Sequence, residues 1–110
     1  MAAGAPNEAS GFRAMNGNDL RSAKTLPERL TPPLAALWHV ARGEWDRAHT
    51  LVQDDDSAEA AWVHAHLHRV EGDEGNAGYW YARARKPHAS VSHDEEWKQI
   101  ADALLLEGGL

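Results

Sequence analysis

A segment of 19 residues recurs in weakened form 29 positions further along this chain. The segment LAALWHVARGEWDRAHTLV begins at Leu34, and its counterpart VHAHLHRVEGDEGNAGYWY begins at Val63. The alignment places Gly43 on Gly72, and glycine readily adopts the left-handed conformation that closes a helix. A repeated unit with a helix stop in its middle predicts helical hairpins that stack on one another.

The same alignment places Ala48 on Ala77. Both alanines fall in the second helix of their unit, where a small side chain allows neighbouring helices to approach closely. We therefore expect both alanines to be buried at a helix contact.

Capping residues and apolar spacing outline five helices and no strand. Thr31 followed by Pro32 is typical of a helix start, and Ser92 with Glu95 forms a capping box that opens the last helix. The expected helices run from Pro32 to a stop at Gly43, over about 44–53, 58–71 and 75–85, and from Ser92 to a stop at Gly108. The predicted fold is all-α, a right-handed stack of two helix-turn-helix hairpins plus a C-terminal capping helix.

Length and composition predict how the chain divides. Residues 1–27 are rich in Gly, Asn, Ala and Ser and keep no steady apolar period, which predicts a flexible N-terminal tail. Residues 28–110 suffice for a single helical-repeat domain. The chain has no cysteine, which excludes disulfides and thiolate zinc sites.

The charge and the hydropathy pattern restrict the possible partners. The formal net charge of -6 argues against nucleic acid or anionic lipid. No apolar run is long enough to cross a bilayer, and the N-terminus lacks the basic and apolar regions of a secretory signal. We therefore expect a cytoplasmic protein that binds neither nucleic acid nor membrane.

The second unit of the repeat resembles the tetratricopeptide and related Sel1-like repeats. The matching positions are Gly72, Asp73, Ala77, Tyr81 and Ala84, which correspond to the turn and second helix of that motif. The period of 29 residues is shorter than the usual ~34. The resemblance implies stacked hairpins, and it implies a surface that binds protein segments.

A closer resemblance covers a shorter stretch. The sequence from Trp62 to Ala84 looks like the core of a family of short bacterial proteins of no established function. That resemblance implies no roles for individual residues, so the chemistry has to be argued from the residues themselves.

Three histidines within five positions suggest a metal or catalytic site. His64 and His68 are four residues apart and share one flank of a helix with Glu71, so they could hold a divalent metal ion such as Zn²⁺. Ala65 stands where the metalloprotease motif has its glutamate. His39 aligns with His68 but has no histidine four residues on, so shared packing explains both. We expect a hydrogen-bonded flank with no cofactor and no tightly bound metal.

A second candidate site lies on the following helix. Asn76, Tyr79, Trp80 and Arg83 fall close together there, and an arginine beside aromatic rings suits recognition of a carboxylate on a protein or small acid. The alternative is that the aromatic rings pack between helices and that Arg83 is merely solvated.

Two classes of function remain open from these residues. The first is a non-enzymatic interaction module, which binds a protein segment or associates with itself, with a homodimer as one form. The alternative is a small metal-dependent or acid-base enzyme that uses His64, His68 and Glu71. Convergence of these side chains on an open cleft favours the enzyme, whereas burial with separate partners favours the module.

Overall fold

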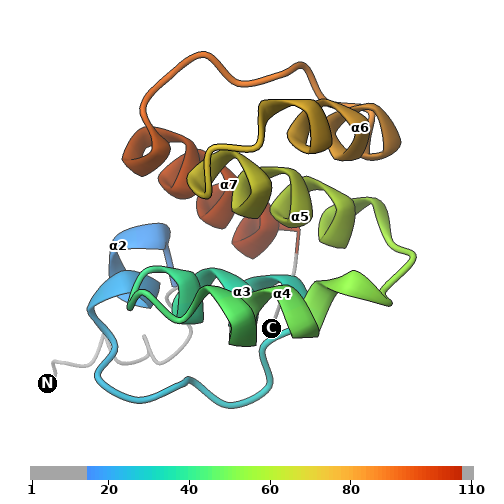
Figure 1. The fold of residues 1–110 in the computed structure, drawn as a ribbon. Helices are drawn as coiled ribbons and strands as arrows, with labels where there is room; N and C mark the ends of the chain where they lie inside the picture. The colour runs from blue at the N-terminus through green and yellow to red at the C-terminus, as the bar shows by residue number, and fades with distance from the viewer. Residues whose placement is uncertain (1–14, 108–110) are drawn as a thin grey trace, which may run out of the picture.

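The computed structural model describes residues 15–107, and all regular structure in that range is helical. The helices, labelled as in Figure 1, are α2 (Gly17–Ser22), α3 (Pro32–Val40), α4 (Trp45–Gln53), α5 (Ala58–Val70), α6 (Glu74–Ala84) and α7 (His93–Leu106). No strand occurs in the described range, so the prediction of an all-α fold is confirmed. The five expected helices are α3 to α7, and α2 was not among them.

Glycines end the first helix of each hairpin, as the repeat predicts. Gly43 and Gly72 have φ angles of 78° and 87°, in the left-handed region. The residue after each glycine donates its N–H to a carbonyl five residues earlier, from Glu44 to His39 and from Asp73 to His68. These bonds satisfy carbonyls that the helix end would otherwise leave unpaired. The chain therefore turns from α3 into α4 and from α5 into α6 in the same way.

The main core lies between the two hairpins and the last helix. α7 packs against α5, α3 and α2, and Figure 1 shows it running behind α5. The apolar face of α7 is buried and includes Trp97, Ile100, Ala101 and Leu104. Apolar side chains of the other helices share this core, among them Leu34, Leu37, Val52, Val63 and Leu67. α7 therefore covers both hairpins from one side.

The α2 helix corrects the predicted domain boundary. Leu20 is fully buried in the main core, and α2 packs against α7. Asn16 caps the helix, and the Gly17 N–H donates to the Asp102 carboxylate at 2.6 Å. A helix of six residues is too short to show an apolar period in the sequence, and Leu20 is the only side chain larger than glycine that α2 buries in the core. The domain begins before residue 28, and residues 1–14 of the predicted tail lie outside the described range.

Candidate functional site

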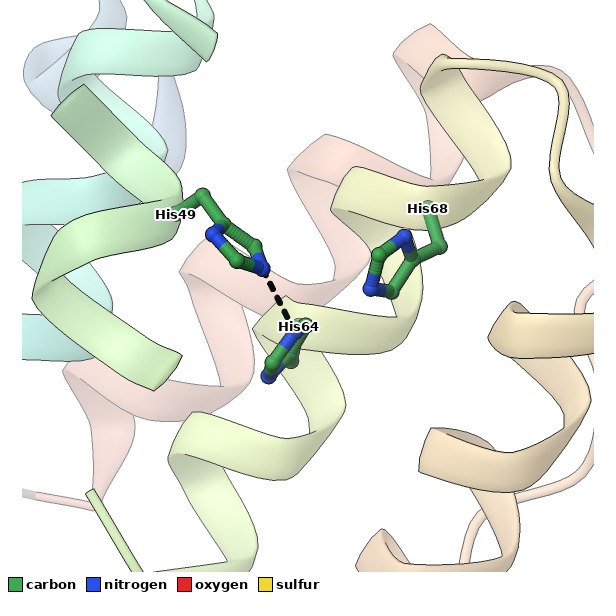
Figure 2. Close-up of side chains that lie close together, drawn as sticks. All are labelled: His49, His64 and His68. Carbon is green, nitrogen blue, oxygen red and sulfur yellow. Dashed lines mark hydrogen bonds between the residues drawn. The ribbon is translucent and has the colours of Figure 1, made fainter. Parts of the chain in front are cut away.

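The structure brings together three histidines rather than two. His64 and His68 of α5 are 3% and 8% exposed, and His49 of α4 lies against them. The His49 and His64 Nε2 atoms are 3.0 Å apart, and one ring nitrogen from each of the three side chains lies within 4.8 Å of the others. Figure 2 shows the three rings gathered between α4 and α5. We call this group the histidine cluster.

Glu71 belongs to the edge of the cluster and not to its centre. Its carboxylate accepts from Nδ1 of His68 at 2.7 Å, and its side chain is partly exposed. Nδ1 of His68 is thereby occupied, which leaves Nε2 as the nitrogen that can face the other two rings. The predicted group of His64, His68 and Glu71 is thus present, with Glu71 orienting one ring.

Tryptophans cover two of the three rings. Trp80 of α6 stacks on His64 with ring centroids 3.9 Å apart, and Trp45 of α4 stacks on His49 at 4.8 Å. Arg83 lies over the outer side of this stack, 5.1 Å from the Trp80 ring. Trp80 therefore belongs both to the predicted partner-binding group and to the cover of the histidine cluster.

Burial keeps part of the cluster neutral. Desolvation lowers the pKa of His64 from its ordinary 6.5 to about 4, and the neighbouring charges of His49, His68 and Arg83 act in the same direction. Desolvation also lowers the pKa of His49, with His68 as the next cause. Both imidazoles are therefore uncharged at neutral pH, which is the form that binds metal ions.

His64 also has a buried atom without a partner. Its Nδ1 is shielded from solvent and makes no hydrogen bond. Nδ1 carries a proton or a lone pair according to the tautomer, and it is unpaired in either case.

The aligned histidine of the first hairpin makes a similar contact. His39 is buried, and its Nδ1 lies 2.6 Å from the Glu44 carboxylate. His68 bonds Glu71 through the same nitrogen. The repeat thus places a histidine next to each glycine turn, and a nearby carboxylate holds each ring. Of these two histidines, His68 also has the rings of His49 and His64 against it.

The predicted partner-binding residues divide into two kinds. Tyr79 is 55% exposed, and Arg83 donates from Nη1 to its hydroxyl at 3.2 Å. Trp80 is half-buried against His64. Asn76 lies at the start of α6, where its side-chain amide donates to Asp73, the residue that caps the helix. Asn76, Tyr79 and Arg83 are therefore exposed, whereas Trp80 is half-buried, and we call these four residues the α6 face.

A buried charged network was not predicted. Glu96 of α7 is 2% exposed, and its carboxylate accepts from His66 Nδ1 at 2.8 Å and from Arg69 Nη1 at 3.0 Å. The Tyr81 hydroxyl donates to its other oxygen. Burial raises the pKa of Glu96, but these hydrogen bonds outweigh it and hold that pKa below its usual value. We call these four residues the Glu96 network.

No local pattern reveals this network. Glu96 lies in the first turn of α7, where an acidic residue is also favoured by the helix dipole. His66 occupies the flank of α5 opposite to His64, which indicates only that it faces a different neighbour. His66 and Glu96 meet only because α7 packs against α5.

The larger pockets of the described residues lie elsewhere. One, of about 310 Å³, lies between the starts of α3 and α5 and the end of α7, and another, of about 530 Å³, lies along α4 beside His39. None of the main pockets within residues 15–107 is lined by His49, His64 or His68. The three histidines therefore line none of these pockets, although Trp45, which stacks on the partly exposed His49, lines one of them.

Within the described range, every helix is too short or too polar to span a bilayer. Comparisons of the chain with protein-family models, with curated proteins and with solved structures found no match. The tetratricopeptide-like arrangement therefore stays a prediction, and the function has to be argued from the geometry.

Proposed function

We propose that this chain is a non-enzymatic helical interaction module that associates with a second copy of itself through the α6 face. The observation that carries the proposal is the exposure of Tyr79 together with the lack of an ion pair at Arg83. Tyr79 is more than half exposed, and Arg83 forms no ion pair with any carboxylate in residues 15–107. Exposed tyrosines, and arginines without a carboxylate partner in their own chain, are typical of the residues that dominate protein interfaces.

The position of α6 leaves this face open to a partner. α6 packs chiefly against α5, and in Figure 1 it lies along the upper edge of the molecule. Its buried residues are Ala77, Tyr81 and Ala84, which point into the protein. Tyr79 and Arg83 lie on the opposite side of the helix, where they are exposed.

An antiparallel pair of copies would bring the two Tyr79 side chains together. The helix has Glu74 at its start, and Arg83, Arg85 and Lys86 at or just beyond its end. In a twofold dimer that crosses near Tyr79, the basic helix end of each copy lies away from the same end of the other. Glu74 lies on the opposite side of the helix from Arg83, where it pairs with His88, so the contact rests on Tyr79 and Arg83.

The enzyme alternative has less support. His64 and His68 are buried, and Trp80 and Arg83 cover the histidine cluster on the α6 side. Acid-base catalysis requires a substrate within hydrogen-bond reach of the catalytic group, and none of the three histidines lines a main pocket within residues 15–107. The α6 face, in contrast, is accessible without any rearrangement.

Sedimentation equilibrium over a wide range of protein concentration tests the proposal. We expect the wild-type chain to form dimers, and we expect Tyr79→Ser and Arg83→Glu each to weaken them by at least tenfold. Arg47→Glu makes the same charge change on exposed α4 and serves as the control. A wild-type chain that stays monomeric at millimolar concentration overturns the proposal.

A further inference from the structure

The histidine cluster has the spacing of a metal centre. Ligands around a tetrahedral zinc ion lie ~2.0–2.1 Å from the metal, which places ligand nitrogens about 3.4 Å from one another. His49 and His64 approach to 3.0 Å, and all three nitrogens of the cluster lie within 4.8 Å. The His64 and His68 rings are stacked at 23° with centroids 4.8 Å apart, so one of them has to turn for both nitrogens to point at a shared ion. Figure 2 shows the rings converging from two different helices.

His49 supplies the third imidazole that His64 and His68 of α5 lack as a metal site. His64 and His68 alone supply two imidazoles from α5, which is too few for a stable centre. His49 adds a third from α4, in the other hairpin. Three imidazoles that converge from two helices complete the protein side of a site that also accepts one outside ligand.

Glu71 supplies the support that such centres require. A histidine that binds a metal normally donates its other N–H to a carboxylate or carbonyl, which fixes the tautomer and the ring orientation. Glu71 makes this contact with Nδ1 of His68 at 2.7 Å. Glu71 is thus a positioning residue for the Nε2 of His68.

The unpaired nitrogen of His64 does not oppose metal binding. When Nε2 of His64 binds a metal, its Nδ1 must carry the proton and is a donor without a partner. Without the metal, Nδ1 is also unpaired, whichever of His49 and His64 donates across their contact. Binding therefore adds no unpaired group that the metal-free protein lacks.

The donor set selects the class of ion. All three donors are imidazoles, which suit Zn²⁺, Cu²⁺ and Ni²⁺, whereas Ca²⁺ and Mg²⁺ prefer oxygen ligands. We propose that His49, His64 and His68 bind one divalent transition-metal ion of the zinc class, which ties the α3–α4 hairpin to the α5–α6 hairpin. This inference does not depend on self-association through the α6 face.

Calorimetric titration tests the site directly. Protein purified without an affinity tag and dialysed against a chelator is titrated with ZnCl₂ in buffer. We expect saturation at about one zinc per chain, with a rise in the melting temperature, because a ligand that binds only the folded state stabilises it. His49→Gln should abolish both effects. His93→Ala, on an exposed histidine outside the cluster, should leave both unchanged, and MgCl₂ should produce neither.

A second variant decides the result if His49→Gln does not fold, as judged by circular dichroism. Glu71→Gln keeps all three ligands and changes an exposed side chain, and it should weaken zinc binding by about 10–100-fold. Zinc affinity that is unchanged in a folded His49→Gln variant overturns the proposal. So does unchanged affinity in Glu71→Gln when His49→Gln is unfolded, or the absence of stoichiometric binding to the wild-type chain.

Discussion

At the scale of single residues, burial of the Glu96 carboxylate carries a large electrostatic cost. A buried carboxylate loses its hydration, and the loss is offset only when donors and opposite charge surround it. Glu96 has three donors, from His66, Arg69 and Tyr81. These side chains come from α5 and α6, so one carboxylate joins three helices.

Replacing Glu96 with glutamine tests this account. Glu96→Gln keeps the shape of the side chain but leaves the buried Arg69 without its counter-charge. Removing one partner of a buried ion pair costs about 3–5 kcal/mol, and we expect urea unfolding to show a loss near the lower end. Glu95→Gln changes the exposed neighbour in the same helix and should cost under about 0.5 kcal/mol. Equal stability of the two variants would show that the network contributes nothing.

The histidines show how far residue patterns alone reach. The spacing of His64 and His68 places them on one flank of a helix, and the structure confirms that they lie together. His49 could not be predicted to join them, because nothing local specifies where α4 lies relative to α5. The contact between Glu96 and His66 could not be predicted for the same reason, since the two residues are 30 positions apart and meet only through packing.

At the scale of elements, prediction succeeded where the determinants are local. Gly43 and Gly72 end their helices, and Ser92 caps α7 by accepting from the N–H of Glu95. These features depend on residues within one turn of each other, so the sequence contains all the necessary information. Val70 lies three residues after the buried Leu67 but is exposed, because α5 ends there.

The tight contact between α5 and α6 leads to a second prediction. Ala77 is fully buried and packs in a small cluster with Ala65 and Tyr81. Ala77→Leu adds atoms where the helices already touch, and overpacking of this kind costs about 1–3 kcal/mol. Ala82→Leu, on the exposed side of the same helix, should change the free energy of unfolding by less than about 0.5 kcal/mol. Thermal melts of dilute protein compare the two, and equal melting temperatures would contradict the packing.

At the scale of the whole molecule, α7 and α2 hold the two hairpins together. α7 reaches both hairpins, and its Trp97 donates its indole N–H to the Leu37 carbonyl of α3 at 2.8 Å. α2 also packs against α7 and carries Leu20 into the same core as both hairpins. The folded unit is thus larger than the repeat that suggested it.

The role of α2 gives the last prediction. A leucine in a flexible tail can be shortened without cost, whereas a fully buried one leaves a cavity. Leu20→Ala should therefore lower the free energy of unfolding by about 2–5 kcal/mol, because Leu20 has no exposed surface and no other side chain of α2 larger than glycine is buried. Leu26→Ala, in the exposed connection to α3, removes the same atoms and should cost far less. Chemical denaturation of both variants measures the difference, and a Leu20→Ala protein as stable as the wild type would place the domain boundary after α2.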